Sequence, residues 1–334
     1  MVPVVPAAPA ADQPGPPRAE RPVTIAVISW NTRELLIRCL RSLLPEVEAH
    51  RAEVWVVDNG SSDGSAAAVR EHAPWAEVVE PGTNLGFGPA VNLIARATDT
   101  EWLAVANADV ALEPGALEAL LATGGDDRVG CVAPRLLLPD GSSQHSVHSL
   151  PTIPFTLALN AGLYRLSARL ADSMLLDGFY DADRVRDVPW AIGAFLLLRR
   201  SAFDEVGGFD EGQWMYAEDL DLGWRLRERG WVTRYQPGAR VRHASGAATV
   251  LAFGDDRTRR FTRETYAVIA RRRGRARAWL IAVVNVIGAG TRVAWMTPAA
   301  LIARRLQAPR DLSKMWLGVH LQGLRLQRSD RERG

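Results

Sequence analysis

The stretch VTIAVISWNTRELLIRCLRSLL, residues 23–44, decides the fold. Its first seven residues, Val23–Ser29, form a short apolar run that is typical of a buried strand. Apolar residues then recur at helical spacing from Leu35 to Leu43, and Thr32 stands where a helix N-cap is expected. A buried strand that leads directly into an amphipathic helix predicts an α/β fold.

The same alternation continues along the chain. The expected strands are Val23–Ser29, Glu53–Asp58, Glu77–Glu80, Trp102–Ala106, Val129–Leu138, Ala194–Leu198 and Trp231–Tyr235. The expected helices are Leu35–Leu43, Ala66–His72, Gly86–Ala97, Pro114–Leu121 and Leu220–Arg229. Strands and helices that alternate with short links predict a mostly parallel central sheet with helices on both faces.

Composition divides the chain into three parts. Residues 1–21 are dominated by Pro and Ala and are expected to be a disordered tail. Residues 22–254 form the α/β domain, in which the irregular stretch 139–188 is an insertion with a predicted helix at Phe155–Leu170. An insertion of this size usually covers or shapes a site, here the acceptor side. Residues 255–334 form a basic and apolar helical extension.

Bulk properties exclude several classes of protein. A net charge of +2 is too small to indicate a nucleic-acid partner. Cys39 and Cys131 each lie in an apolar stretch, which indicates core residues in a reducing compartment. The longest apolar run, Ala278–Thr291, is interrupted by Arg292 and is shorter than the ~18–20 residues of a spanning helix. The protein is therefore expected in the cytoplasm, either soluble or lying on a membrane surface.

The extension has two interpretations. Nine Arg and one Glu lie between Arg257 and Arg277, followed by the apolar segment Ala278–Ala303 with Trp279 and Trp295. The arginines could form a solvated helix face. They could also anchor the chain to anionic lipid at the inner face of the cell membrane, with the apolar segment in the plane of the interface.

Polar side chains follow the first four predicted strands. They are Ser29 and Asn31, then Asp58 and Asn59, then Asn84, then Asn107 and Asp109. Ligands of open parallel sheets bind beyond the carboxyl ends of the strands, so these residues predict a binding rim. The rim suits a nucleotide diphosphate, because carboxylates and amides accept from a pyrimidine N–H. Gly86 and Gly88 would let the backbone approach a phosphate or ribose closely.

Two further features concern the chemistry. Asn107-Ala108-Asp109 places two oxygen-bearing side chains on one side of an extended turn, a pattern that suits Mg²⁺ or Mn²⁺. Glu218-Asp219-Leu220-Asp221 opens a helix. Acidic residues there stabilise the helix dipole, but a carboxylate such as Asp219 could also take the proton of an attacking hydroxyl.

Taken together, these motifs resemble the GT-A-fold family-2 glycosyltransferases, and most closely the rhamnosyltransferase-like branch that decorates lipid-linked or cell-wall glycans. The resemblance runs from about Val23 to about Ser245. It is carried by ISWN (28–31), VDNGSSDG (57–64), NLGFG (84–88) with Asn92, NAD (107–109), GAF (193–195), FDEVGGFD (203–210) and EDLD (218–221).

The resemblance implies a role for each matched position. Asp58 would hold the base, and Asn84 and Asn92 would line the nucleotide pocket. Asp109 would bind the metal that bridges the diphosphate, and His243 would complete the metal shell. Asp219 would be the general base, supported by Glu218. Asn107 departs from the family's Asp-x-Asp pattern, which removes one negative charge from the metal site.

The implied activity is inverting transfer of a sugar, such as L-rhamnose from dTDP-rhamnose, to a hydroxyl of a lipid-linked or cell-wall glycan. One carboxylate base and one metal suffice for direct displacement. Two alternatives stay open at this point. A nucleotide-sugar pyrophosphorylase would show a Gly-rich phosphate loop with a basic residue after the first strand, where this chain has Ser29-Trp30-Asn31-Thr32. A non-catalytic nucleotide-sugar or glycan-binding module would not require Glu218 and Asp219.

Overall fold

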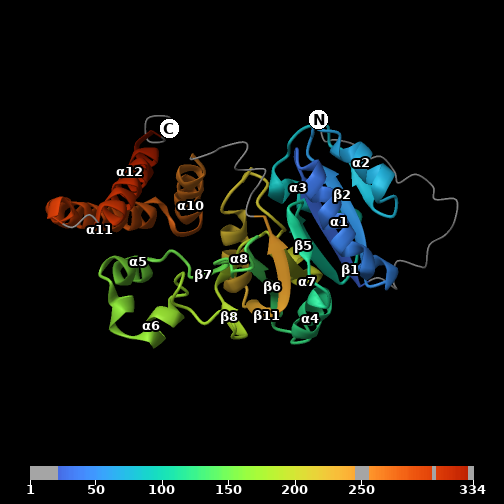
Figure 1. The fold of residues 1–334 in the computed structure, drawn as a ribbon, viewed down its shortest axis with the longest axis horizontal. Helices are drawn as coiled ribbons and strands as arrows, with labels where there is room; N and C mark the ends of the chain where they lie inside the picture. Colours follow the sequence, from blue (N-terminus) through green and yellow to red (C-terminus); the bar gives the residue numbers. More distant parts are fainter. Residues whose placement is uncertain (1–21, 245–255, 303–305, 330–334) are drawn as a thin grey trace. The chain divides into compact units, whose positions relative to one another are not determined.

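The computed structural model describes residues 22–244, 256–302 and 306–329, and these form two compact units (Figure 1). The first unit contains residues 22–148 and 182–244. The second contains residues 149–181 together with the C-terminal helices. The chain therefore leaves the first unit, contributes to the second, and returns before the C-terminal helices begin.

A nine-stranded sheet organises the first unit, in the order β3-β2-β1-β4-β10-β6-β11-β5, with β8 also pairing with β11. The strands are β1 (Val23–Ser29), β2 (Ala52–Asp58), β3 (Glu77–Val79), β4 (Trp102–Asn107), β5 (Val110–Leu112), β6 (Val129–Leu137), β8 (Arg186–Val188), β10 (Phe195–Arg199) and β11 (Val232–His243). A separate pair joins β7 (Val147–His148) and β9 (Trp190–Ala191).

The central strands run parallel, as predicted. β1 pairs in parallel with both β2 and β4, and β3 extends the parallel set beyond β2. β10 is the exception inside the sheet, since it lies antiparallel between β4 and β6. β11 is longer than the predicted Trp231–Tyr235, and its far end pairs antiparallel with the short strand β5, which the sequence analysis missed.

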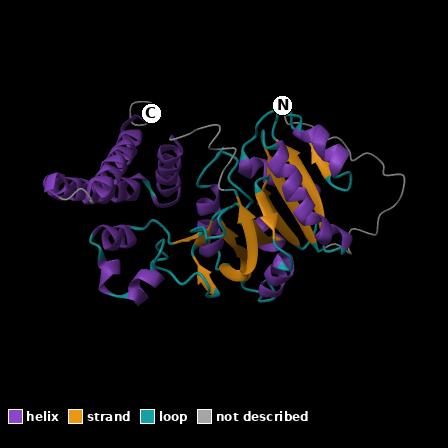
Figure 2. Cartoon of the chain, in the orientation of Figure 1, coloured by secondary structure: helices purple, strands orange, loops and turns teal. Residues whose placement is uncertain are grey.

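Helices pack against this sheet (Figure 2). They are α1 (Arg33–Glu48), α2 (Ser65–His72), α3 (Phe87–Ala97), α4 (Ala116–Thr123), α7 (Arg200–Glu205) and α8 (Glu218–Glu228). Cys39 and Cys131 are free and buried in the core, as predicted. Thr32 precedes α1 but makes no side-chain cap bond. Instead the Arg33 N–H donates to Asp63 Oδ2 at 2.9 Å, so a neighbouring loop supplies the cap.

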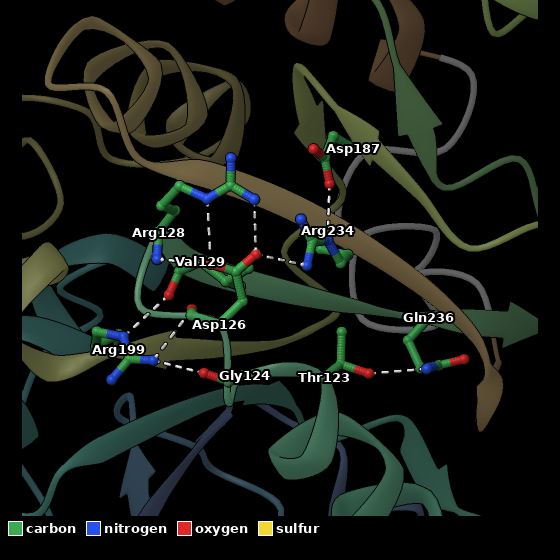
Figure 3. A network of polar contacts seen from close by, with 9 residues as sticks. All are labelled: Thr123, Gly124, Asp126, Arg128, Val129, Asp187, Arg199, Arg234 and Gln236. Atoms are coloured by element: carbon green, nitrogen blue, oxygen red, sulfur yellow. Dashed lines mark hydrogen bonds and ion pairs between the residues drawn. The ribbon is translucent and has the colours of Figure 1, made fainter.

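A polar network fixes the strands β6, β10 and β11 to one another (Figure 3). The Arg199 guanidinium donates to the carbonyls of Gly124 and Val129, at the end of α4 and the start of β6. Arg234 on β11 pairs with Asp126 at 3.1 Å and with Asp187 on β8 at 2.7 Å. Asp126 also accepts from Arg128, and these hydrogen bonds hold the pKa of its carboxyl well below the usual range.

The second unit is helical. It contains α5 (Ile153–Asn160), a 3₁₀ turn at Leu163–Leu166, α6 (Ala168–Ser173), α10 (Arg257–Arg273), α11 (Arg275–Ile302) and α12 (Gln307–Ser329). The single helix predicted at Phe155–Leu170 is therefore wrong, because Gly162, with φ +71°, ends the first helical piece. α5 packs against α11, which also packs against α10 and α12. Residues 149–181 of the insertion thus belong with the C-terminal helices.

A chain of hydrogen bonds ties these helices together. Tyr266 Oη on α10 lies 2.8 Å from His320 Nδ1 on α12 and accepts from Asn285 Nδ2 on α11 at 3.1 Å. Asn160 Nδ2 on α5 donates to Asn285 Oδ1 at 2.9 Å. Burial raises the pKa of Tyr266 to about 12, so its hydroxyl stays a donor as well as an acceptor.

Arg292 on α11 belongs to the same network. Its two terminal nitrogens donate to Asn160 Oδ1, each at 3.2 Å. Because that charge is turned toward α5, it does not interrupt the exposed surface of α11. Over Arg275–Pro298, α11 is long and apolar enough to cross a membrane by length and composition alone. The uninterrupted apolar run still ends at Arg292, as the sequence indicated, but the helix as a whole reaches spanning length.

Candidate active site

The carboxyl ends of the parallel strands meet at one edge of the sheet. The register pairs Ser29 with Asp58, and Ile28 with Asn107. The predicted rim residues on the first, second and fourth strands therefore lie at the same edge, as the sequence analysis expected.

The loops that follow these strands are joined by side-chain hydrogen bonds. Asn31, in the left-handed region with φ +52°, accepts from the Ser62 N–H at 2.8 Å, and its own N–H donates to Ser61 Oγ. Asn59 is buried, donates to the Gly86 carbonyl at 3.1 Å, and accepts from the Leu85 N–H. These contacts hold the loops after β1, β2 and β3 as one wall.

Asp58 has a structural task in this wall. Its two carboxylate oxygens accept from the Ser61 N–H at 2.8 Å and from the Ala66 N–H at 3.1 Å, and the residue is 3% exposed. Each oxygen keeps a second lone pair, so a base N–H could reach only the outer edge of the carboxylate.

Two residues predicted to contact the nucleotide are buried and make hydrogen bonds within the protein. Ser29 is buried, and its hydroxyl lies 3.1 Å from Thr32 Oγ1. Asn92 is buried as well. Its amide nitrogen donates to the Phe209 carbonyl and to Glu211, and its oxygen accepts from the Phe209 N–H at 2.9 Å. Asn92 therefore holds the loop at 208–211, and its part in the nucleotide pocket stays a prediction.

Packing within the protein accounts for the glycines of the third loop. A Cβ on Gly86 would lie 2.0 Å from the carbonyl oxygen of Trp214, and one on Gly88 would lie 2.8 Å from the Phe209 Cβ. The sequence analysis explained both by close approach to a ligand. Packing by neighbouring segments is a second reason for glycine at both positions, and close approach of a ligand stays a prediction.

Trp214 links the third loop to the segment that precedes α8. Its indole N–H donates to the Asn84 carbonyl at 3.3 Å, and its own carbonyl accepts from the Phe87 N–H. Asn84 Oδ1 accepts from the Gly86 N–H at 2.9 Å, which completes the turn. Tyr216 and Ala217 follow with φ of +67° and +61°. Consecutive left-handed residues other than glycine are strained, and such strain gathers at functional sites.

Asp219, in the first turn of α8, is joined to the end of β4 through two neighbouring residues. Asp219 Oδ2 accepts from the Gly193 N–H at 3.0 Å, and the next residue, Ala194, accepts from the Asn107 N–H at 2.9 Å. The predicted base and the predicted metal triplet are therefore connected through two hydrogen bonds and the residues Gly193 and Ala194. No spacing in the sequence indicated that the strand start at 193–194 would connect them.

The surroundings of Asp219 favour its protonated form relative to an ordinary aspartate. Burial raises the pKa of its carboxyl, and hydrogen bonds from the Gly193 and Leu220 backbones partly oppose this. Glu218 precedes it in the same turn and is half-buried. Asp221 differs from both, since it is fully buried and pairs with Arg225 at 2.8 Å. Asp221 therefore forms an internal ion pair, in addition to any stabilisation of the helix dipole.

Asp109 and His243 meet although 134 positions separate them in the numbering. β5 begins one residue after Asp109 and pairs with the end of β11, so Val110 lies opposite His243. His243 Nε2 lies 3.3 Å from Asp109 Oδ1, and both side chains are 6% exposed. Gln144 Oε1, from a residue to which the sequence analysis gave no role, lies 2.7 Å from His243 Nδ1.

This pair fits a divalent cation. A carbonyl oxygen such as Gln144 Oε1 can only accept, so Nδ1 carries a proton, and in the neutral imidazole Nε2 then presents its lone pair. Nε2 is buried without a hydrogen bond among the described residues and faces a carboxylate oxygen. Two acceptors that face each other call for a cation between them. In the described part of the chain no third His, Cys, Asp or Glu joins the pair, which suits a metal completed by substrate phosphates and water.

Sequence comparison identifies the family. Residues 24–207, more than half of the chain, match glycosyl transferase family 2, and residues 151–324 match glycosyl transferase family group 2. The chain belongs to glycosyl transferase family 2. It is a glycosyltransferase, which removes the two alternatives left open by the sequence.

Relatives of this family-2 enzyme agree with the fold. The chain is 35% identical over 241 residues to an N-acetylglucosaminyl-diphospho-decaprenol L-rhamnosyltransferase of Mycobacterium tuberculosis, covering 67% of this chain and 76% of that one. The mannosyltransferase PcManGT from Pyrobaculum calidifontis, solved with GDP-Man and Mn²⁺, superposes with a TM-score of 0.59 at 19% identity, over 94% of this chain and 90% of that chain.

A more distant structure shares the same fold. GalNAc-T7, solved with UDP, GalNAc and Mn²⁺, superposes with a TM-score of 0.50 at 15% identity, over 66% of this chain and 43% of that chain. At these sequence identities the two structures support only the assignment of the fold, which is GT-A.

Proposed function

We propose that this glycosyltransferase moves a sugar, with L-rhamnose from dTDP-rhamnose as the first candidate, onto a hydroxyl of a lipid-linked glycan with inversion at the anomeric carbon. The rhamnosyltransferase of M. tuberculosis, whose name specifies an N-acetylglucosaminyl-diphospho-decaprenol acceptor, supports the donor and acceptor classes. The observation that carries the mechanism is the connection of Asp219 to the strand end that bears Asn107 and Asp109.

In this proposal the wall formed by the first three loops holds the donor nucleotide. Asn31, Asn84 and Asn107 are each partly exposed at the strand ends, so their amides can reach a base or ribose. Asp58 offers only the outer edge of its carboxylate.

Asp219 takes the proton of the acceptor hydroxyl as that oxygen attacks the anomeric carbon. Its carboxylate is held by the Gly193 and Leu220 N–H groups, which fix its orientation. A raised pKa makes a carboxylate a stronger base once it is ionised. Glu218 lies beside it and adds negative charge that favours an incoming proton.

Asp109 and His243 would hold the divalent metal, Mg²⁺ or Mn²⁺, whose contribution when bound is to neutralise charge on the leaving diphosphate. Gln144 orients the His243 ring through Nδ1. Asn107 supplies an amide oxygen and no charge at the neighbouring position, which lowers the negative charge of the site.

The test is a donor screen on the purified full chain. A panel of nucleotide-sugars is offered with a polyprenyl-diphosphate N-acetylglucosamine acceptor, and products are followed by mass spectrometry with the anomeric configuration read by NMR. A rhamnosylated product of inverted configuration is expected. Transfer of a different sugar would overturn the donor assignment, and a product with retained configuration would overturn the single-displacement mechanism.

A further inference from the structure

One face of α11 carries exposed apolar side chains and no charge. Trp279, Leu280, Ile287 and Trp295 are 46%, 43%, 59% and 65% exposed. At 3.6 residues per turn, these four positions fall within roughly 160° of the helix circumference. They extend over roughly 24 Å of helix at 1.5 Å per residue.

The opposite side of the helix makes the polar contacts. Arg292 is the only charged residue between Trp279 and Pro298, and it donates to Asn160 of α5. Asn285 bonds to Asn160 and to Tyr266, and Gly288 lies directly beneath the Asn160 side chain. Since packing within the unit uses this side, the apolar stripe is left facing outward.

Positive charge precedes the stripe along the chain, and Arg271, Arg272, Arg273, Arg275 and Arg277 lie within eight residues of Trp279. Nine arginines and one glutamate fall between Arg257 and Arg277, along α10 and the first turn of α11. Arg277, two residues before Trp279, is exposed. An exposed apolar stripe with tryptophans near both ends and a strongly basic neighbour is the pattern of a helix that lies in the surface of an anionic membrane.

We propose that α11 lies in the plane of an anionic lipid bilayer surface, with the stripe of Trp279, Leu280, Ile287 and Trp295 embedded and the arginines at the junction of α10 and α11 near the phosphates. The inference deepens the proposed function, because a lipid-linked acceptor would be found at the same surface. The helix lies along the membrane and does not cross it, since crossing would strip Asn285 and Arg292 of their partners and place them in hydrocarbon.

Vesicle flotation of the full chain tests this. The vesicles contain phosphatidylcholine alone, or equal parts of phosphatidylcholine and phosphatidylglycerol, with neither donor nor acceptor present. We expect binding to the anionic vesicles, weakened by salt through screening. Combined substitution of Ile287→Glu and Trp295→Glu should lower binding by about tenfold or more, because two embedded side chains are replaced by charges.

Val185→Glu is the matched control. Val185 is 49% exposed and belongs to the first unit, so the substitution adds one negative charge, as each change in the double variant does, to an exposed apolar position elsewhere. Its binding should equal that of the parent. Equal binding by the double variant and the parent would overturn the proposal. So would resistance to alkaline carbonate extraction, which indicates a spanning helix, or lipid-free self-association that the double variant abolishes, which indicates a second copy on the stripe.

Transfer to a water-soluble acceptor, measured in parallel, separates the two proposals. Lost vesicle binding with intact transfer in the double variant supports the membrane face while leaving catalysis untouched. Absence of vesicle binding by a parent enzyme that transfers rhamnose refutes the membrane face alone. Vesicle binding by a parent enzyme that transfers no sugar from any donor refutes the proposed function alone.

Discussion

The proposed role of Asp219 as the base can be tested by replacing one oxygen of its carboxylate with an amide nitrogen. Asp219→Asn keeps the size of the side chain but removes the group that takes the proton, so turnover should fall by about 10²–10⁴. Donor binding measured by calorimetry should change little, because the residues proposed to hold the nucleotide lie on other loops. Glu228→Gln, in the exposed last turn of the same helix, removes the same charge and should leave turnover near normal.

Asp221 is not a suitable control for that experiment, because its buried pair with Arg225 also holds the Val206 and Gly208 carbonyls through the same guanidinium. The pH profile adds a second readout. The active form is ionised, and burial raises the pKa of Asp219. Activity should therefore rise with pH along a limb that lies above the range of an ordinary aspartate. A limb at the ordinary position, or near-normal turnover in Asp219→Asn, would exclude this base.

The pair of Asp109 and His243 predicts metal dependence. Asp109→Asn removes the only carboxylate of the pair, so it should abolish most turnover and weaken Mn²⁺ binding measured by paramagnetic relaxation. Chelator should abolish turnover of the parent, and Mg²⁺ or Mn²⁺ should restore it. Gln144→Glu is informative beside it, since a carboxylate at the same position still accepts from Nδ1 and should retain metal binding. Full turnover in excess chelator would remove the metal from the mechanism.

At the scale of elements, the contact between the third loop and the segment before α8 is a coupling that substitution can break. Gly86 has φ +90° and no room for a Cβ, because the Trp214 carbonyl would lie 2.0 Å away. Gly86→Ala should displace that segment and with it the first turn of α8. A misplacement of about 1 Å can cost about 10²-fold in rate, so a loss of kcat on that order is expected.

Gly82→Ala is a control that introduces backbone strain in the same loop without displacing the segment that contains Trp214. Gly82 has φ +79° in the same loop, and nothing lies within 4 Å of a Cβ there. Alanine in the left-handed region costs roughly 1–2 kcal/mol, which applies to Gly82. Gly86, with φ +90° and ψ 179°, lies in a region essentially reserved for glycine, so alanine there carries backbone strain of its own as well as the clash. Only Gly86→Ala should lower kcat, while both should lower the melting temperature. Equal effects of the two on kcat would mean that strain in the loop, and not the Trp214 contact, governs activity.

The network around Asp126 predicts a pH dependence of stability that activity does not share. The pKa of Asp126 is depressed in the folded chain by hydrogen bonds from Arg128 and Arg234. Its contribution is therefore complete above the unfolded pKa of about 3.9 and is lost as pH falls through the lower folded value. Asp126→Asn should lower the melting temperature at neutral pH, and the difference from the parent should shrink below about pH 4. An unchanged difference at low pH would contradict this.

The parallel half of the sheet and the polar residues at its edge could be predicted from the sequence, because a buried strand and the polar turn after it are local features. β5 and the far end of β11 could not be predicted, because they form only when these two distant segments pair. The same limit applies to the site. Asp109, Asp219 and His243 could be proposed from the family resemblance. The hydrogen bonds of Asn92 to the loop at 208–211 depend on tertiary contacts, which sequence spacing does not reveal. The same is true of the contacts of Trp214 with Asn84 and of Gln144 with His243.

At the scale of the whole molecule, the path of the chain determines whether a deletion removes one structural feature or several at once. Residues 149–181 leave the sheet-bearing unit and pack with helices that begin more than 70 positions later. Deleting the C-terminal helices would remove the partners of α5 as well as the arginines and the apolar stripe. Truncation therefore cannot assign a loss of activity or membrane binding to one of these features, and point substitutions are needed.

Two glycines of α11 provide such a test of how the second unit is held together. A Cβ on Gly288 would lie 1.9 Å from Asn160 Oδ1, whereas a Cβ on Gly290 meets nothing within 4 Å. Gly290→Ala should stabilise the helix by up to about 1 kcal/mol, the usual difference between the two residues in a helix interior. Gly288→Ala gains the same propensity but pushes Asn160 away from Asn285 and Arg292, for a net loss of about 1–3 kcal/mol. Hydrogen exchange in α5 and trypsin cleavage at Arg165 and Arg169 should therefore speed up in Gly288→Ala and slow down or stay unchanged in Gly290→Ala. If both variants protect α5 equally, the contact between α5 and α11 does not hold residues 149–181 in the second unit.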